Sequence, residues 1–297
     1  MKLSVLTATY NRSNYLEKIY KSILKNIETS SIEAEWIIIN DGSTDNTEKV
    51  IENLIFENRI EIKYLFQENS GKMEAINRGM EEVAGEMIVD CDSDDFFTDN
   101  AFRIIEQNAS KLLENEKIYA LCFLKQDLLG NISGKMFPKD YMESKMFDLY
   151  FKQDIKGEKI LVFNAEIRKK YKHELEKNEK FITEARMYHK MDEKYKIICI
   201  NESIEIGEYQ EDGYTKNIRK TFFNNPNGYY MYFKEILQKG LKKVKLEKKI
   251  YILKMYGLFF IIRLKNILRF YFKNKKRFWL IWYMSKSFLD SILKNYA

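Results

Sequence analysis

The sequence predicts an α/β fold built on a parallel sheet. Short apolar runs alternate with amphipathic segments over the first hundred residues, turn-forming clusters separate them, and apolar residues make up 45% of the 297-residue chain. Strands that alternate with helices form parallel sheets through right-handed crossovers. Because ligands of such sheets bind at the carboxyl ends of the strands, we expect the chemistry there.

Each element follows from its local pattern. Residues 11–26 carry apolar side chains at helical spacing, whereas residues 36–39 form a short buried run that a turn cluster closes at residues 40–43. Ser43 and Thr44 are expected to cap the next helix. The predicted strands are residues 3–7, 36–39, 60–66, 86–89, 119–124 and 201–209. The predicted helices are residues 11–26, 47–57, 72–83 and 183–191.

Charge divides the chain into a body and a tail. Residues 240–297 carry 15 Lys and Arg against 2 acidic residues, whereas residues 1–239 carry 35 against 42. Beyond residue 217 the composition shifts to aromatics and lysines, so we place a domain boundary near residue 220. The three cysteines are odd in number and far apart in sequence, which excludes a disulfide framework and a cysteine-based zinc site.

Acidic residues follow two of the predicted strands. Asp41 comes after the second strand, and Asp90, Asp92, Asp94 and Asp95 follow the fourth. An extended backbone would direct Asp90, Asp92 and Asp94 to one side. Carboxylates packed this closely repel one another, and a hard cation such as Mg²⁺ or Mn²⁺ relieves the repulsion. A solvated acidic turn is the alternative, but two acidic loops at neighbouring strand ends favour the metal site.

A glycine-containing loop, the two histidines and Cys91 have either functional or ordinary structural interpretations. The loop of residues 69–72 precedes a helix, so its amides and Lys72 are candidates for phosphate binding. His173 lies in a lysine-rich, surface-like stretch and His189 within a predicted helix, and we interpret both as structural. Cys91 is expected to point away from the neighbouring aspartates.

Four motifs together resemble those of the family 2 glycosyltransferases, which have the GT-A fold. They are V-L-T-A-T-Y-N-R (residues 5–12), I-N-D-G-S-T-D (39–45), N-S-G-K-M-E-A-I-N-R-G (69–79) and A-G-E-M-I-V-D-C-D-S-D-D (84–95). Their order and spacing over about ninety-five residues make the resemblance specific. It implies a Rossmann-like GT-A domain, which we place over residues 1–220 with a nucleotide-binding half (1–97) and an acceptor half (98–220). The shift in composition places a basic, aromatic-rich helical extension at residues 221–297.

The resemblance also assigns roles to single residues. It implies a nucleoside diphosphate sugar as donor, usually a uridine diphosphate (UDP) sugar, with Thr9 and Asp41 holding base and ribose and Lys72 near the nucleotide. Asp92 and Asp94 form the D-x-D motif that positions ribose and metal. Asp95 is an alternative metal ligand. Ala8 occupies a position where many members have proline. We expect this difference to make the loop less rigid without removing a group that takes part in the reaction.

The resemblance also implies that the sugar is transferred with inversion at its anomeric carbon, which requires a general base. The family places it at a helix start, and Glu184 is the carboxylate in the matching segment T-E-A-R-M-Y-H-K (residues 183–190). A carboxylate at a helix start is also favoured by the helix dipole alone, which is the structural alternative. Glu179 and Asp192 are the nearest substitutes. Residues 210–214 weakly resemble a late loop that approaches the donor in relatives.

The tail is expected to form an amphipathic helix. On a helix through residues 250–273, one polar face would contain Lys254, Lys265, Asn266, Arg269 and Lys273. Arg263 would lie outside this face, and bulky apolar residues would occupy the rest of the helix. Aromatic residues with basic flanks suit an anionic membrane surface. Packing on the body or on a twin subunit is the alternative, so a homo-oligomer stays open. We expect no nucleic-acid partner, because no recognised nucleic-acid fold accompanies the charge.

These inferences combine into one hypothesis. It is a Mn²⁺- or Mg²⁺-dependent inverting glycosyltransferase that acts on a glycan or lipid-linked acceptor, cytoplasmic and peripheral on the inner face of the cell membrane. No stretch reaches the length of roughly 18–20 apolar residues that a spanning helix needs. The rival hypotheses are a nucleotide-sugar-binding protein without turnover and a membrane-bound assembly scaffold.

Overall fold

The structure is a computed structural model that describes residues 1–207 and 218–271. It divides into two compact units. The first consists of residues 1–174 and 184–216, and the second of residues 175–183 and 217–297. Residues 175–183 and the chain beyond residue 216 thus belong to the same unit.

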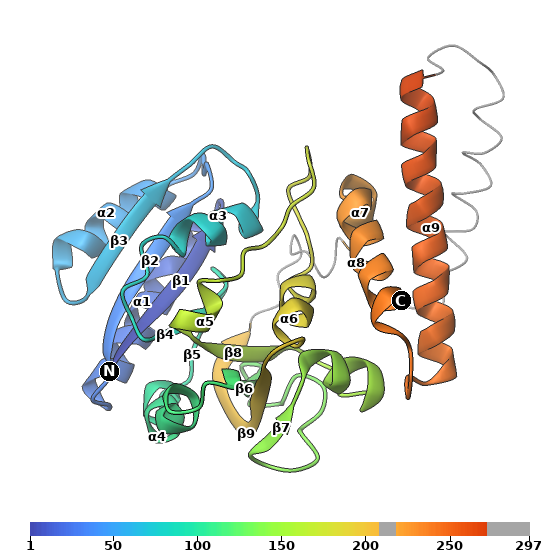
Figure 1. Cartoon of the computed structure of the whole chain (residues 1–297). Coiled ribbons are helices and arrows are strands. Elements are labelled where there is room, and N and C mark those ends of the chain that lie inside the picture. Colours follow the sequence, from blue (N-terminus) through green and yellow to red (C-terminus); the bar gives the residue numbers. More distant parts are fainter. Residues whose placement is uncertain (208–217, 272–297) are drawn as a thin grey trace. The chain divides into compact units, whose positions relative to one another are not determined.

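The first unit is built on a mixed sheet. Its strands lie in the order β3-β2-β1-β4-β8-β6-β9-β5, with β7 paired to β9 (Figure 1). The strands are β1 (Lys2–Thr9), β2 (Glu33–Asn40), β3 (Glu61–Phe66), β4 (Met87–Asp90), β5 (Asp95–Phe97), β6 (Ile118–Gln126), β7 (Met142–Ser144), β8 (Lys159–Asn164) and β9 (Lys196–Gly207).

The expected parallel sheet is correct for only part of this unit. β3, β2, β1 and β4 run parallel to one another, as predicted. β8 runs antiparallel to both β4 and β6. The chain that joins β6 to β8 contains β7 and a short helical turn (Asp148–Lys152) instead of a full crossover helix. Without such a crossover, the returning strand enters the sheet in the opposite direction.

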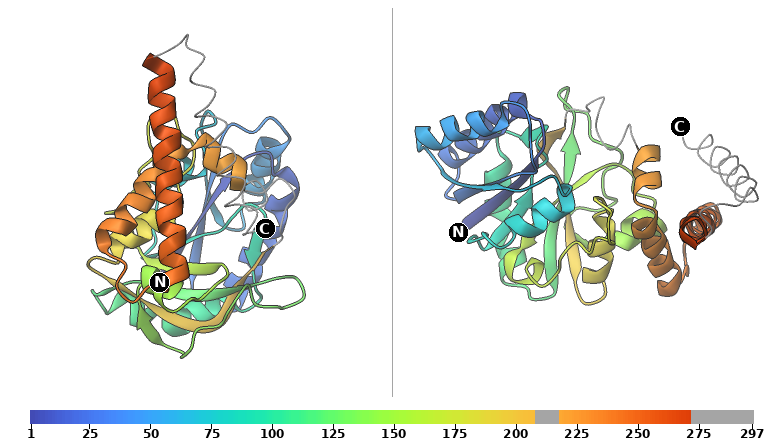
Figure 2. Two further views of the ribbon diagram at one scale, coloured as in Figure 1. Left: turned by 90° about the vertical axis from the view of Figure 1, so that its right-hand side faces the viewer. Right: turned by 90° about the horizontal axis from the view of Figure 1, so that it is seen from above.

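Helices cover both faces of the sheet (Figures 1 and 2). On one face α1, α2 and α4 bury apolar side chains against Val5, Trp36 and Val89. On the other, α3, α5 and α6 pack against Leu6, Ile39 and Ile88. The helices are α1 (Ser13–Glu28), α2 (Thr47–Glu57), α3 (Lys72–Gly79), α4 (Ala101–Leu113), α5 (Ala165–Arg168) and α6 (Ala185–Met191).

The start of α2 differs from the predicted cap. The helix begins at Thr47 as expected, but Ser43 and Thr44 do not bind its first amides. Asp45 Oδ1 accepts a hydrogen bond from the Thr47 amide at 3.0 Å instead. The Ser43 hydroxyl instead accepts a hydrogen bond from the Asn11 amide at 3.0 Å, and this bond connects the turn to the residues that follow β1.

The second unit is helical and has its own aromatic core. It contains α7 (Ile218–Asn224), α8 (Pro226–Lys239) and α9 (Leu246–Tyr271). Phe222 and Tyr229 meet edge to face at 4.5 Å between ring centroids, and Tyr229 stacks on Phe259 of α9 at 5.2 Å. The predicted tail helix therefore exists, and part of its apolar surface is buried within its own unit.

Residues 175–183 join this unit through a helix end. The Glu179 carboxylate accepts hydrogen bonds from the amides of Asn227 and Gly228 at the start of α8, both at 2.7 Å. First-turn amides of a helix have no partner within the helix, so a carboxylate there is stabilising. Glu179 is thus committed to α8, which argues against its use as a substitute base.

Candidate active site

The site lies where β1, β2 and β4 end, as predicted for a parallel sheet. The Asp41 amide donates to the Thr9 carbonyl at 2.9 Å, which sets the two loops side by side. Thr9 is buried, and its hydroxyl has no bonding partner among the described residues. The roles of Thr9 and Asp41 toward base and ribose stay predictions.

Asp41 organises the loop before α3. Its carboxylate accepts from the Ser70 amide at 2.7 Å, the Gly71 amide at 2.8 Å and Gln67 Nε2 at 2.7 Å. Gly71 has a φ of +96°, a conformation that residues with a Cβ rarely adopt. The expectation that these amides face phosphate is therefore wrong for Ser70 and Gly71, because Asp41 already uses both.

Lys72, the first residue of α3, joins the two predicted halves of the reaction site. Its Nζ lies 2.6 Å from Asp92 Oδ1 and 2.8 Å from Glu184 Oε1. Tyr188 donates to the other Glu184 oxygen at 3.1 Å. Glu184 directly precedes α6, and the Tyr188 side chain lies one helical turn further on. The structure thus brings Lys72, Asp92 and Glu184 together from three separate segments.

The ammonium of Lys72 determines the charge state of this group. Burial alone would raise the pKa of Glu184, but the charge of Lys72 and its hydrogen bond outweigh it and lower the pKa to about 2. Burial likewise acts to lower the pKa of Lys72, and the charges of Asp92 and Glu184 overcome it and hold that pKa well above its ordinary value. Lys72 and Glu184 are therefore both ionised at neutral pH.

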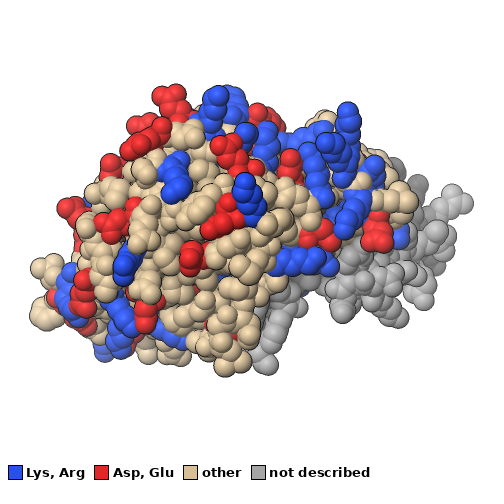
Figure 3. Space-filling model, turned by 90° about the horizontal axis from the view of Figure 1, so that it is seen from below, with Lys and Arg blue, Asp and Glu red and all other residues tan. Residues whose placement is uncertain are grey.

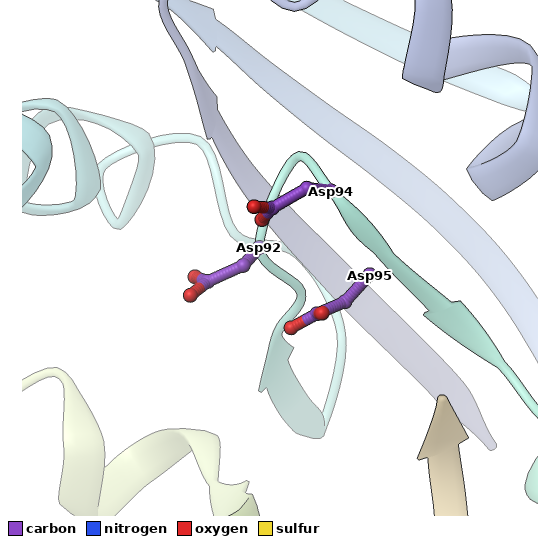
Figure 4. Close-up of side chains that lie close together, drawn as sticks. All are labelled: Asp92, Asp94 and Asp95. Carbon is purple, nitrogen blue, oxygen red and sulfur yellow. The ribbon is translucent and has the colours of Figure 1, made fainter. Parts of the chain in front are cut away.

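The acidic loop after β4 gathers three carboxylates. One oxygen each from Asp92, Asp94 and Asp95 lies within 4.8 Å of the others. Figure 4 shows the three side chains extending to the same side of the loop. Burial and the nearby charge of Asp92 raise the pKa of Asp94. A divalent cation would relieve this repulsion, and the oxygen-only donor set suits Mg²⁺ or Mn²⁺.

The membership of this cluster differs from the predicted one. The chain turns at residues 93–94 before β5 begins, so the backbone is not extended from Asp90 to Asp94. Asp90 consequently does not belong to the cluster, and Asp95 does. Cys91 is buried in the apolar core on the other face of the sheet, as predicted.

Asp95 is held by the protein itself. Its carboxylate lies 2.5 Å from Lys125 Nζ on β6, and that ammonium also lies 2.9 Å from Glu158 and 3.6 Å from Glu205. The Asp95 and Glu205 side chains are only 5% and 2% exposed, whereas Asp92 is 44% exposed. Asp92 and Asp94 therefore fit a metal ligand set better than Asp95, which is buried and held by Lys125.

Asp192, the other substitute for the base, and His189 both have structural roles. The Asp192 carboxylate accepts from the amides of Met146 and Phe147 at 3.1 and 2.8 Å, deep in the first unit. His189 is buried with its ring against the edges of Phe147 and Phe151, in agreement with a structural role. The late loop at residues 210–214 lies outside the described residues.

Sequence reasoning missed a polar group behind Glu184. His173 was expected at the surface but is buried, and its Nε2 lies 3.3 Å from the guanidinium of fully buried Arg168. Burial, reinforced by the Arg168 charge, lowers the pKa of His173 to about 3. Burial raises the pKa of neighbouring Asp90 to about 6, against the opposing charge of Arg168. The only sequence signal was Asp90, a charge that ends an apolar strand.

Comparison with known proteins identifies the domain. The family model described as "Glycosyl transferase family 2" matches residues 4–122, which include the site segments from Thr9 to Asp95. Residues 4–122 belong to glycosyl transferase family 2. The first unit that contains this family 2 domain has the GT-A fold.

Several glycosyltransferases are similar in sequence to this chain over part of their length. The family 2 domain is similar to an uncharacterised glycosyltransferase of Mycoplasma genitalium, 38% identical over 114 residues, which are 37% of this chain and 38% of the relative. A Campylobacter jejuni GalNAc(5)-diNAcBac-PP-undecaprenol beta-1,3-glucosyltransferase is 31% identical over 184 residues, 60% of this chain and 57% of that protein. The chain thus spans well under two thirds of these relatives.

Solved structures share the fold at low sequence identity. TarS of S. aureus (residues 1–349) has a TM-score of 0.59 and 20% identity over 96% of this chain and 79% of that one. The mannosyltransferase PcManGT of Pyrobaculum calidifontis, solved with GDP-Man and Mn²⁺, has a TM-score of 0.55 and 15% identity over 98% and 85% of the two chains.

Replacing Lys72 by methionine tests its hold on Glu184. Without the ammonium, burial acts unopposed, and we expect the pKa of Glu184 to rise from about 2 past the ordinary 4.5. In the wild type the lowered pKa contributes stability that is complete above pH 4.5 and is lost as the pH falls toward 2. Carboxyl-detected NMR titration, with Glu184→Gln to assign the signal, measures the shift. Lys72→Arg keeps the charge and should leave the pKa low; a Glu184 pKa that stays near 2 in Lys72→Met would contradict the assignment.

Proposed function

We propose that this chain is a metal-dependent inverting glycosyltransferase that transfers a sugar from a UDP-sugar to a hydroxyl of a lipid-linked glycan or cell-surface polysaccharide. The observation that carries the proposal is the Lys72 bridge between Asp92 of the D-x-D motif and Glu184. One ammonium thus holds the carboxylate of the D-x-D motif and the candidate base close to each other, as transfer from a donor to an activated acceptor requires.

Glu184 takes the proton of the acceptor hydroxyl in this mechanism. The acceptor oxygen then bonds to the anomeric carbon, the bond from that carbon to the diphosphate oxygen breaks on the opposite face, and the proton stays on Glu184. Asp92 and Asp94 would hold a divalent cation, which supplies positive charge beside the departing diphosphate. Lys72 supplies a second positive charge from the protein.

Donor binding and base strength are coupled through Lys72. A diphosphate arriving beside Asp92 competes with Glu184 for the ammonium. As Lys72 turns to the diphosphate, Glu184 loses the interaction that lowers its pKa and becomes a stronger base. The base is therefore weak while the donor is absent.

The comparisons support the donor and acceptor classes. TarS has been solved in complex with UDP and with UDP-GlcNAc, which favours a uridine nucleotide. The Campylobacter jejuni relative and a bactoprenol glucosyl transferase homolog of Escherichia coli, 32% identical over 94 residues, are named for polyprenyl-linked substrates. The mannosyltransferase solved with GDP-Man and Mn²⁺ supports a metal-dependent site.

The second unit is proposed to bind an anionic membrane surface on the cytoplasmic side. Leu246, Ile250, Leu253, Phe260 and Leu264 lie at heptad-like spacing along α9 and are 43% to 71% exposed. This row, here called the α9 stripe, is flanked by Lys248, Lys249, Lys254, Arg263 and Lys265. A twin α9 would bring these like charges together, whereas anionic headgroups would neutralise them.

Two further observations bear on the membrane proposal. Among the described residues, no helix combines the length and apolar character needed to cross a membrane, so the α9 stripe is proposed to lie in the interface. On the face drawn in Figure 3, acidic and basic side chains of the described residues are interspersed. The net positive charge of the chain is concentrated instead in residues 240–297.

A donor panel tests the enzymatic proposal. We expect one UDP-sugar to raise the melting temperature by several degrees in the presence of Mn²⁺, since ligand at about a hundredfold over Kd adds ~2.7 kcal/mol. Asp94→Asn should abolish the part of the rise in melting temperature that depends on Mn²⁺, because the substitution removes a proposed metal ligand. Asp99→Asn, the same change at an exposed acid paired with Lys25, is the control. Stabilisation by no UDP- or GDP-sugar, with or without Mn²⁺, would contradict the proposal.

Vesicle flotation tests the membrane proposal. The full chain should float with phosphatidylglycerol vesicles at low salt and less at high salt, because screening weakens the attraction of the basic flanks. Leu253→Ser with Phe260→Ser should reduce flotation several-fold, whereas Phe56→Ser on α2, which is 92% exposed, should not. Absence of flotation, or a stripe-dependent dimer in light scattering without lipid, would overturn the assignment.

A further inference from the structure

Tyr188 is the second polar contact of the candidate base. Its hydroxyl donates a hydrogen bond to Glu184 Oε2 at 3.1 Å, and its backbone amide donates to the Glu184 carbonyl at 3.2 Å, one helical turn away. Lys72 Nζ contacts the other carboxylate oxygen, Oε1, at 2.8 Å. The two carboxylate oxygens of Glu184 therefore have different partners, a phenol hydroxyl on one and an ammonium on the other.

These two partners differ in their freedom to move. The Tyr188 ring packs on Phe163 of β8, with 5.9 Å between ring centroids, and lies against the apolar core on that face of the sheet. Burial, together with the charge of Glu184, raises the pKa of Tyr188 well above its ordinary value, so the hydroxyl keeps the proton that it donates. Lys72 carries its charge on a flexible four-carbon stem. Tyr188 therefore keeps its contact when the ammonium of Lys72 turns to a diphosphate.

Oε1 is the oxygen of Glu184 that shares its partner with the D-x-D motif. The Lys72 ammonium that contacts Oε1 lies 2.6 Å from Asp92 Oδ1 as well. The Glu184 side chain is 34% exposed, so an acceptor can reach it from solvent. Once Lys72 turns away, Oε1 is left to accept a proton, whereas the hydrogen bond from Tyr188 still lowers the basicity of Oε2.

We propose that Tyr188 is a positioning residue, which fixes the carboxylate plane of Glu184 and makes Oε1 the atom that takes the proton of the acceptor. This inference rests on the proposed function. In the transfer the O–H bond of the acceptor breaks and its proton binds Oε1. The acceptor oxygen bonds to the anomeric carbon as the diphosphate leaves with the electron pair of the broken bond. Glu184 becomes neutral, and its Oε2 still accepts the hydrogen bond from Tyr188.

Tyr188→Phe removes the hydroxyl and keeps the ring on Phe163. We expect kcat to fall about 10- to 100-fold, because a carboxylate that is free to rotate leaves its productive geometry, while the donor KM changes by no more than about twofold. Tyr119→Phe is the matched control. The Tyr119 ring stacks on the same Phe163 at 6.4 Å, and its hydroxyl donates to the buried Asp192 carboxylate at 3.2 Å. This variant should leave kcat within about twofold.

Two further measurements separate positioning from a general loss of structure. Carboxyl-detected NMR should show the pKa of Glu184 rising from about 2 in Tyr188→Phe but staying below 4.5, because Lys72 still lowers it, with no rise in Tyr119→Phe. The double variant Glu184→Gln with Tyr188→Phe should transfer at the rate of Glu184→Gln alone. A residue that acts only through the base adds nothing once the base is gone.

The results that would overturn the role of Tyr188 are an unchanged kcat or an unchanged Glu184 pKa in Tyr188→Phe, equal losses in Tyr188→Phe and Tyr119→Phe, or losses that multiply in the double variant. A wild type that binds donor but transfers no sugar to a polyprenyl-linked or polysaccharide acceptor would instead overturn the proposed function. The wild-type assay alone reveals that case.

Discussion

The site depends on one ammonium group held between two carboxylates. Lys72 touches Asp92 and Glu184, which lie 92 positions apart in the sequence and would repel each other without it. Lys72 is in turn placed by Asp41, which binds the amides of Ser70 and Gly71 just before it. The end of β2 thus fixes the start of α3, and the start of α3 fixes the distance between donor motif and base.

A second lysine, Lys125, gives Asp95 a different role from the other aspartates of the acidic loop. Lys125 contacts both Asp95 and Glu205, so Asp95 anchors the turn to β6 and β9. Asp92 and Asp94 are partly exposed to solvent. Burial and the charge of Asp92 raise the pKa of Asp94. Three aspartates within four residues thus have different surroundings: Asp95 is buried against Lys125, Asp92 is half-exposed beside Lys72, and Asp94 lies next to Asp92. Removing one partner from a buried pair of this kind costs about 3–5 kcal/mol, which keeps the anchor in place.

Local sequence patterns predicted the strands and helices on which the site residues lie. The features that were not predicted depend on contacts between segments that are far apart in the sequence. Apolar periodicity identified β1 to β4, and the bounds of α2 were predicted correctly. The D-x-D motif and the Glu184 segment followed from resemblance. The antiparallel β8, the pairing of Asp95 with Lys125 and the capping of α8 by Glu179 each join segments 30 or more residues apart. His173 was misplaced for the same reason, since its lysine-rich neighbours concealed the buried Arg168 beside it.

The central claim is that the Lys72 bridge presents Glu184 as the base of a turnover enzyme, which a protein that only binds nucleotide sugars would not need. The most direct test is Glu184→Gln, with transfer rate and donor affinity measured on the same protein. The account predicts that kcat falls about 10²–10⁴-fold, as for loss of a general base, while the donor Kd changes by no more than about threefold. Transfer at the wild-type rate in this variant, or no transfer by the wild type to any polyprenyl-linked or polysaccharide acceptor although it binds donor, would contradict it.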